Sequence, residues 1–223
     1  MHSTPQQTSA KGLVAPKAAS VTTRTNAIVP ANYLRIKDFL PIEEHDQLFE
    51  YVLQQEPNFV AAGVQAADLT YRQARVLYSF PQFSEAMTSL VELLLPDVLS
   101  QLGLPLFPIS KIEAQLTAYN DGNYYITHND RDSPESASRQ ISYIYYFHRQ
   151  PKPFSGGELR IYDCKYEEKK YVVADSFQTI EPIDNSIVFF QSGYAHEILP
   201  VRCPSQAFAD SRFTLNGWVR SES

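Results

Sequence analysis

Length, composition and charge limit what this chain can be. Its 223 residues suffice for one domain with a tail, and the abundance of Tyr (14) and Phe (13) favours strands and shaped loops over a helical bundle. The first 37 residues contain five basic residues and no acid, which leaves 14 basic against 25 acidic residues in the remainder. Because nucleic-acid binding requires clustered Lys and Arg, this acidic body argues against nucleic acid and favours a neutral or basic substrate.

The N-terminal segment and the two cysteines bear on localisation. Residues 1–30 are rich in Ser, Thr, Ala and Gln without a sustained period, so we expect a poorly ordered tail. A transit peptide is the alternative, because the segment is basic and free of acids. Cys164 and Cys203 are too few for a disulfide framework, and we expect free thiols in a reducing cytoplasm. We expect no membrane span, since the most apolar run, 90–99, contains Glu92 and Pro96; the oligomeric state stays open.

Residues 31–223 are expected to form a single domain that begins with helical support at about 41–104. A first helix should start at Pro41 and end before Pro57, because its apolar residues fall on one helical stripe. That stripe consists of Ile42, Leu48, Phe49, Val52 and Leu53. A second helix should run from about Ser84 to Gly103, with Pro96 kinking or dividing it. His45 has no nearby partner of ligand type and is expected at the surface.

From about 109 to 220 the sequence changes to closely spaced strands, separated by turn signals such as Asn120-Asp121-Gly122 and Gly156-Gly157. Eight strands are predicted, at 111–119, 124–128, 139–148, 158–162, 171–180, 186–191, 196–201 and 212–219. This spacing is typical of a sandwich or a double-sheet barrel. We therefore expect a mainly β fold, a jelly roll with the two N-terminal helices packed on one sheet.

His128 and Asp130 are the first candidate metal ligands. In an extended segment both side chains leave the same face of the strand. Two histidines and a carboxylate with open coordination positions form the ligand set of non-haem Fe(II) oxygenases, although the pair alone would also fit a surface turn. His196 follows a buried strand and a turn, which places it at a sheet end where a barrel mouth is expected. A core or rim histidine is the alternative reading of His196.

Arg212 opens an otherwise apolar strand. By strand parity it shares a face with Thr214, Asn216 and Trp218. On an inward face the charge of Arg212 would require an anion, and its planar guanidinium group can bind a carboxylate at two points. The alternative is an edge-strand arginine that points to solvent.

Together these segments resemble the 2-oxoglutarate and Fe(II)-dependent oxygenases of the prolyl 4-hydroxylase type. The resemblance covers roughly residues 110–220 and keeps the order of the family's segments. The segments are His128-Asn129-Asp130, 144–147 (IYYF), 155–159 (SGGEL), 187–190 (IVFF), 196–201 (HEILPV) and 212–218 (RFTLNGW).

The resemblance implies a double-stranded β-helix, also called a jelly-roll or cupin-like fold, in which His128, Asp130 and His196 bind Fe(II). It implies that Arg212 and Tyr146 bind the distal carboxylate of 2-oxoglutarate. The other positions that would approach or enclose this cosubstrate are Tyr119, Asn216, Ile144, Leu159, Ile198 and Trp218. Tyr125 would lie beside the metal, as structural support or as a substrate contact. O2 would be the second cosubstrate and ascorbate a supporting reductant, and the carboxylate of Asp130 favours hydroxylation over halogenation.

The sequence departs from the family pattern at two places. The cation that binds the cosubstrate usually follows the second histidine more closely, whereas residues 202–210 enlarge the turn before Arg212. Arg202 is therefore a rival for this role. His148 stands where the family often carries Asn, and it is not expected to be a ligand, because the set of three is already complete.

The leading hypothesis is hydroxylation of an amino-acid side chain, a prolyl residue in a peptide or protein being the first candidate. The alternatives are a tailoring hydroxylase of a free amino acid, a modified peptide or another small metabolite, and a non-catalytic binding module on the same fold. The substrate should be selected by residues 58–75 and 131–139. Acids expected near the mouth could favour a basic partner or simply form a solvated loop; they are Asp121, Asp132 and Glu135.

Overall fold

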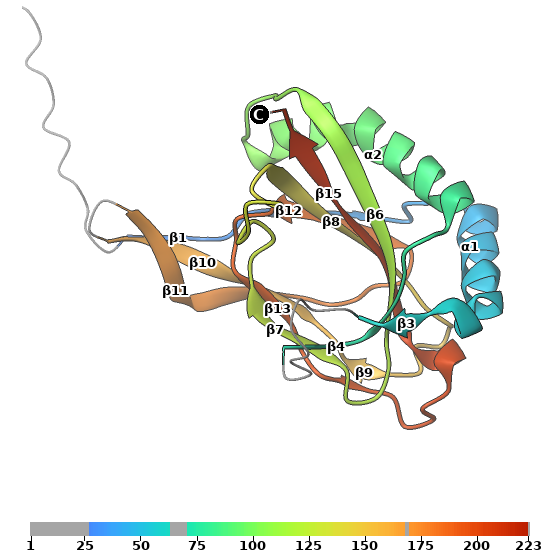
Figure 1. Cartoon of the computed structure of the whole chain (residues 1–223). Coiled ribbons are helices and arrows are strands. Elements are labelled where there is room, and N and C mark those ends of the chain that lie inside the picture. Colours follow the sequence, from blue (N-terminus) through green and yellow to red (C-terminus); the bar gives the residue numbers. More distant parts are fainter. Residues whose placement is uncertain (1–26, 63–70, 168–169, 223) are drawn as a thin grey trace, which may run out of the picture.

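The computed structural model describes residues 27–62, 71–167 and 170–222, and in it two antiparallel sheets face each other (Figure 1). The strand order of the larger sheet, here the major sheet, is β2 (Tyr33–Lys37), β12 (Ser186–Gln191), β8 (Arg139–Phe147), β15 (Arg212–Ser221), β6 (Ile109–Tyr119), β5 (Arg75–Leu77) and β3 (Val60–Ala61). The minor sheet has the order β1 (Ile28–Val29), β10 (Leu159–Glu167), β13 (His196–Ile198), β7 (Tyr124–His128) and β4 (Arg72–Gln73), and β11 (Lys170–Ile180) also pairs with β10. β9 (Ser155–Gly156) and β14 (Val201–Arg202) form a separate pair, and the short 3-10 helices are Glu56–Asn58 and Phe208–Asp210.

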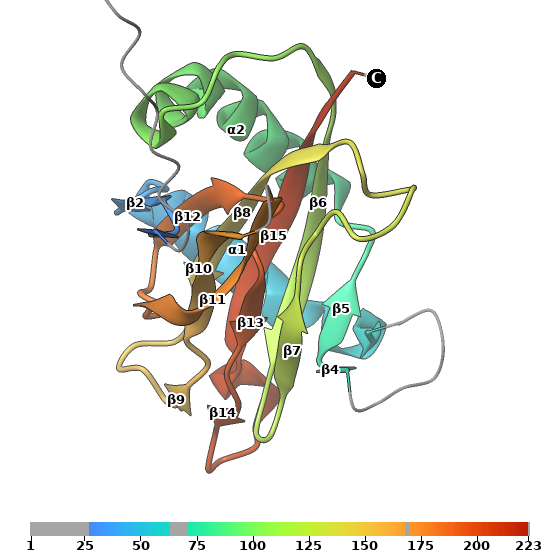
Figure 2. The same cartoon turned by 90° about the vertical axis from the view of Figure 1, so that its left-hand side faces the viewer.

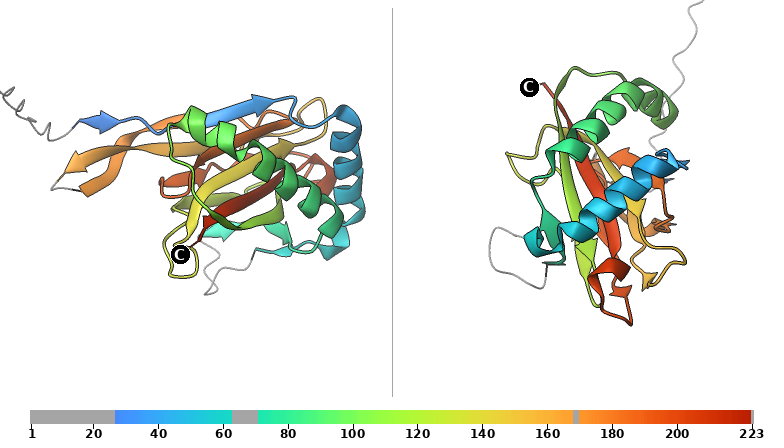
Figure 3. Two further views of the ribbon diagram at one scale, coloured as in Figure 1. Left: turned by 90° about the horizontal axis from the view of Figure 1, so that it is seen from above. Right: turned by 90° about the vertical axis from the view of Figure 1, so that its right-hand side faces the viewer.

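Two helices, α1 (Ile42–Gln54) and α2 (Pro81–Leu102), cover the outer face of the major sheet (Figure 3). Their apolar stripes pack on the strand residues that point outward, such as Tyr143, Tyr145 and Phe147 of β8. Gly103 ends α2 in the left-handed conformation, as expected. Of the two expected effects of Pro96, a kink or a division, the division is wrong, because α2 continues through this residue as one helix. Within the described residues, neither helix combines the length and apolar character that a membrane crossing needs.

A second apolar core lies between the two sheets. Inward-facing residues of the major sheet, such as Ile144, Tyr146 and Phe190, pack against Leu159 and Ile161 of the minor sheet. Successive residues of β8 and β12 belong alternately to the two cores, because successive strand residues point to opposite faces of the sheet. The long strands β6, β8 and β15 form the wall behind the inter-sheet space (Figure 2).

The predicted double-stranded β-helix, or jelly roll, with helices on one sheet is confirmed. β7 and β12 have the predicted bounds, β10 is longer than predicted, and 196–201 is divided between β13 and β14. Residues 28–29, expected in the tail, instead form β1 and pair with Lys165 and Cys164 of β10; residues 1–26 lie outside the described part. Both cysteines are free thiols.

His45 is a second correction, since it was expected at the surface. It is buried, and its ring nitrogens lie 3.0 Å from Asp184 Oδ1 and 3.1 Å from Asp46 Oδ1. Asp184 belongs to the turn before β12, which lies next to α1 only in the folded chain. No local pattern in the sequence could indicate this long-range partner.

Candidate active site

Strand pairing in the minor sheet brings the three candidate ligands together. β13 runs antiparallel to β7, with His196 directly opposite His128. Asp130 follows two residues after β7, and its backbone N–H donates to Ser192 O at 3.0 Å. β7 ends at His128, so Asp130 reaches the histidines from a turn and not from the strand that was expected to present it.

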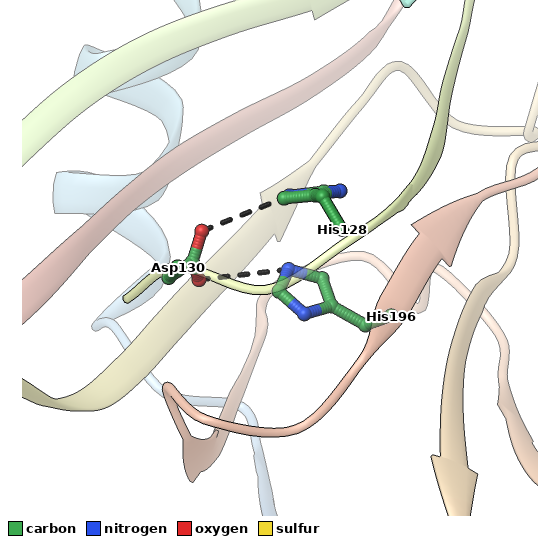
Figure 4. A group of neighbouring side chains, drawn as sticks. All are labelled: His128, Asp130 and His196. Atoms are coloured by element: carbon green, nitrogen blue, oxygen red, sulfur yellow. Dashed lines mark ion pairs between the residues drawn. The ribbon is translucent and has the colours of Figure 1, made fainter. Parts of the chain in front are cut away.

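The two imidazoles aim the same nitrogen at Asp130 (Figure 4). His128 Nε2 lies 3.7 Å from Asp130 Oδ1, and His196 Nε2 lies 3.5 Å from Asp130 Oδ2. The other ring nitrogen of each histidine donates to a backbone carbonyl, His128 Nδ1 to Ile126 O at 2.8 Å and His196 Nδ1 to Tyr194 O at 2.9 Å. These bonds fix the tautomer that leaves both Nε2 lone pairs free for a metal.

The electrostatics of the group favour metal binding. Burial, and after it the nearby His196, lowers the pKa of His128 to about 3, so this imidazole is neutral at pH 7. Burial alone would raise the pKa of Asp130, but His196, His128 and hydrogen bonds from Ser142 and Trp218 outweigh it and hold this pKa below its ordinary value. One ligand atom from each residue lies within 4.8 Å of the others. This donor set, two imidazoles and one carboxylate, fits Fe(II) in a non-haem site.

A cavity of about 280 Å³ opens on the three ligands. Residues on the same face of β15, Arg212, Thr214, Asn216 and Trp218, all line it, as strand parity predicted. The other expected wall residues that line it are Tyr119, Tyr125, Ile144 and Ile198. Leu159 does not line the cavity; it is fully buried in the core behind it. Tyr125 stacks on His128, with ring centroids 3.6 Å apart.

Arg212 lies at the inner end of this cavity and is 1% exposed. Its guanidinium carbon lies 5.1 Å from the ring centroid of Tyr119 and 5.0 Å from that of Tyr146, and its Nε donates to Gly157 O at 2.7 Å. Gly157 permits this approach, because it has a φ of +71° and a Cβ there would lie 2.6 Å from Arg212 Cδ. The Gly156-Gly157 pair in the sequence therefore shapes the site of the arginine.

Two buried polar atoms beside each other lack a well-directed partner among the described residues, namely Arg212 Nη2 and the Tyr146 hydroxyl. Burial raises the pKa of Tyr146, which keeps its hydroxyl protonated as a donor. Unsatisfied buried donors are costly in a folded protein unless a ligand completes them. A carboxylate would satisfy the guanidinium of Arg212, which lines the cavity, and the neighbouring phenol of Tyr146, which does not line it. The Arg212 end of the cavity therefore fits the distal carboxylate of 2-oxoglutarate.

The two departures in the sequence do not alter this site. Arg202 is exposed on β14 and does not line the cavity, so the expected rival to Arg212 is excluded. His148 is buried, and its ring nitrogens face Arg149 O and Pro182 O at 3.1 and 3.3 Å. It is therefore not part of the histidine and aspartate group.

Three of the residues that line the cavity were not named individually from the sequence, although two of them, Arg72 and Arg139, belong to the segments 58–75 and 131–139 that were expected to select the substrate. Ser142 Oγ lies 2.6 Å from Asp130 Oδ2, and its parity with Ile144 and Tyr146 could have indicated an inward position. The guanidinium carbon of Arg139 lies 3.7 Å from the centroid of the Trp218 ring. Arg72 comes from β4, which is two residues long and carries no periodic signal.

Comparison with known proteins agrees with this geometry. Residues 114–220 match the model of the 2OG-Fe(II) oxygenase superfamily. A Synechocystis protein described as an uncharacterized PKHD-type hydroxylase is 43% identical over 87% of this chain, and the chain spans 65% of that relative's length.

Two solved structures have a similar fold. A Pseudomonas putida prolyl-4-hydroxylase has a TM-score of 0.61 at 23% identity, over 86% of this chain and 94% of its own. A Trichoplax adhaerens prolyl hydroxylase, solved with a peptide fragment of hypoxia inducible factor, also has a TM-score of 0.61, at 19% identity over 85% of this chain and 83% of its own. The fold and the donor set agree with these similarities: residues 114–220 match the 2OG-Fe(II) oxygenase superfamily, and the fold is similar to that of two prolyl hydroxylases.

Proposed function

We propose that this protein is an Fe(II)- and 2-oxoglutarate-dependent dioxygenase that hydroxylates an amino-acid side chain, with a prolyl residue of a peptide or protein as the first candidate. The observation that carries the proposal is the convergence of His128 Nε2, His196 Nε2 and Asp130 on one point of a cavity whose inner end is Arg212. The resemblance to prolyl hydroxylases, one of them solved with a peptide, supports a peptide substrate.

Each residue has a role in this proposal. His128, Asp130 and His196 hold Fe(II), and Arg212 and Tyr146 orient 2-oxoglutarate through its distal carboxylate. Asn216 and Tyr119 flank the cosubstrate, and Ile144, Ile198 and Trp218 limit the access of water. When bound, iron and 2-oxoglutarate supply the oxidising power: O2 is consumed, 2-oxoglutarate becomes succinate and CO2, and one oxygen atom enters a C–H bond of the substrate. The chain contributes position and a shielded cavity.

The test is a matched pair of isosteric substitutions. Asp130→Asn removes the charge of a proposed ligand. Asp175→Asn makes the same change at an exposed residue of β11 that does not line the cavity. With Fe(II), 2-oxoglutarate, ascorbate, O2 and a panel of proline-containing peptides, we expect wild type and Asp175→Asn to form succinate and to add one oxygen to a peptide. Asp130→Asn should lose about 100-fold or more of both activities, because the remaining ligands hold iron weakly.

The outcomes separate the alternatives. Full activity of Asp130→Asn would disprove the ligand assignment. Succinate formation without oxidation of any peptide, but with oxidation of a free amino acid or metabolite, would identify a tailoring hydroxylase. Binding of neither Mn(II) nor 2-oxoglutarate by the wild-type protein would favour the non-catalytic module.

A further inference from the structure

A second arginine lies in the wall of the cavity. β4 pairs with β7 so that Arg72 is opposite Tyr125, and the Arg72 guanidinium carbon lies 4.9 Å from the centroid of the Tyr125 ring. Tyr125 in turn stacks on His128. One aromatic ring therefore separates the charge of Arg72 from a proposed iron ligand. Arg72 also lines a neighbouring cavity of about 410 Å³, so it lies between the two spaces.

Arg72 has no carboxylate partner among the described residues. Its Nη2 lies 3.3 Å from Thr117 Oγ1, its remaining close neighbours are Tyr78, Tyr119 and Tyr125, and its Nε has no hydrogen-bond partner in the described part of the chain. Cation–π contacts offset only part of the cost of removing a guanidinium from water. Arg160 offers a contrast, since it lies over Phe177 but is paired with Glu197 at 3.3 Å.

Two other charged residues outside the proposed iron and cosubstrate sites line the cavity. One is Asp132, which accepts from the Asn129 amide and has no cation partner among the described residues, and the other is Arg139. Arg139 is paired with Glu113, its Nε lying 2.9 Å from Glu113 Oε2. In the proposed function, the charges of Fe(II), Asp130, doubly negative 2-oxoglutarate and Arg212 cancel. Arg72 is then the one cation that faces the cavity, within the described residues, without a counter-charge.

We propose that Arg72 binds a carboxylate of the substrate, and that this protein accepts substrates with a carboxylate close to the carbon that is hydroxylated. The proposal rests on the proposed function and narrows its substrate class. The carboxylate is either an α-carboxylate, from a free amino acid or a chain end, or the side chain of an acidic residue beside the target. An acidic substrate would differ from the neutral or basic one that the net charge suggested, because Arg72 lies in the wall of the site.

Two pairs of probes test the proposal and distinguish the two sources. N-acetyl-L-proline is compared with N-acetyl-L-prolinamide, and the peptide acetyl-Ala-Pro-Glu-amide with acetyl-Ala-Pro-Gln-amide. Dissociation constants are measured calorimetrically on the full chain loaded with Mn(II) and 2-oxoglutarate. We expect the acidic member of at least one pair to bind about tenfold or more tightly than its neutral partner, because a charge-assisted hydrogen bond is lost in the amide.

Three variants assign this preference to Arg72. Arg72→Gln should remove the discrimination and leave the affinity for 2-oxoglutarate within about twofold, whereas Arg72→Lys should retain part of it. Arg160→Gln, the matched control outside the cavity, should behave as wild type. Thermal unfolding verifies that each variant is folded, and Arg72→Lys keeps the test decisive if Arg72→Gln does not fold.

The proposal fails in two distinguishable ways. Equal affinities within both pairs, or no binding by any probe to protein that binds Mn(II) and 2-oxoglutarate normally, would overturn it and leave the oxygenase assignment intact. Loss of 2-oxoglutarate affinity in Arg72→Gln would overturn it by assigning this arginine to the cosubstrate. Failure of the wild-type protein to bind Mn(II) and 2-oxoglutarate would instead contradict the proposed function itself.

Discussion

At the scale of the residue, two serine hydroxyls position Asp130. Ser142 Oγ lies 2.6 Å from Asp130 Oδ2 and 2.9 Å from Ser192 Oγ. An ionised carboxylate can only accept, and a hydroxyl has one proton to donate. Ser142 therefore donates to Asp130, and Ser192 donates to Ser142. Both serines are almost completely buried, so no solvent competes for these bonds.

Removal of the Ser142 hydroxyl should loosen Asp130 without removing a ligand. We expect Ser142→Ala to weaken Mn(II) binding by about 10-fold, the lower end of the effect of losing a partner that orients a metal ligand. Titration with Mn(II) measures this change independently of turnover. Ser186→Ala is the matched control, because Ser186 is equally buried but donates to Ile183 O at 2.7 Å, away from the site. Equal metal affinity in Ser142→Ala and wild type would show that Ser142 has no positioning role.

Individual site residues could be predicted from the sequence where the chemistry of the site requires a combination of residue types that is uncommon by chance. His128, Asp130 and His196 lie together in the folded chain, as their residue types and the order of the family's segments predicted. Ser142 escaped notice because a buried serine on a strand has many neutral uses. Arg72 lies in the segment 58–75 that was expected to select the substrate, but it was not singled out, because its strand owes its position to pairing with β7, a contact across more than 50 residues that no local pattern encodes.

At the scale of the element, α2 shows why a strong local signal was overridden. Pro96 lacks the N–H that would bond the carbonyl of Glu92, and a proline within a helix costs about 3 kcal/mol. Beyond it Val98, Leu99 and Leu102 are buried in the core under the helices. Burial of each such side chain contributes about 1.5–3 kcal/mol. Continuation of the helix therefore outweighs the penalty, and Pro96 itself stays exposed.

Pro96→Ala should stabilise the protein. The helix regains a hydrogen bond, but the unfolded chain regains up to about 1 kcal/mol of freedom, so we expect a net gain of about 1–2 kcal/mol. For a chain of this size that corresponds to a rise in Tm of about 2–8 °C in a thermal unfolding scan. Pro81→Ala is the control at the first position of the same helix, where proline is tolerated and no gain is expected. A lower Tm in Pro96→Ala would contradict this account.

The strands were predicted best where one or both faces are buried. β12 has its expected bounds because its continuous apolar run is buried on both faces. β7 also has its expected bounds, although Ile126 and Thr127 in its middle are exposed. β10 continues past its predicted end at Tyr162 to Glu167, through polar residues that have no strand signal of their own. Hydrogen bonds to β11 hold this part of β10, with Cys164 opposite Val173 and Tyr166 opposite Tyr171. Such an extension is a property of the pair of strands and could not be predicted from one of them.

At the scale of the whole molecule, His45 connects the helical layer to the sheet. It lies on α1, and Asp184, its partner, also accepts the backbone N–H of His148 at 2.9 Å in the turn region after β8. The hydrogen bond that the His45 ring donates to Asp184 is the largest cause that raises the pKa of His45; burial opposes it and a hydrogen bond to Asp46 adds to it. Because both ring nitrogens face carboxylates, only the protonated ring can donate to both.

This contact predicts that the contribution of His45 to the stability of the folded protein decreases as pH rises. A raised pKa in the folded state means that the contribution of His45 is complete below the unfolded value near pH 6.5 and is lost as pH rises through the folded pKa. The difference in Tm between wild type and His45→Gln should therefore be largest at pH 5–6 and should decrease towards pH 8.5. His148→Gln is the control of opposite sign, because burial lowers the pKa of His148 and its contribution is present above pH 6.5 and lost on acidification. Thermal unfolding of the three proteins at several pH values gives both slopes, and a His45→Gln difference that stays constant from pH 5 to 8.5 would exclude a charged His45 as the connection between α1 and the sheet.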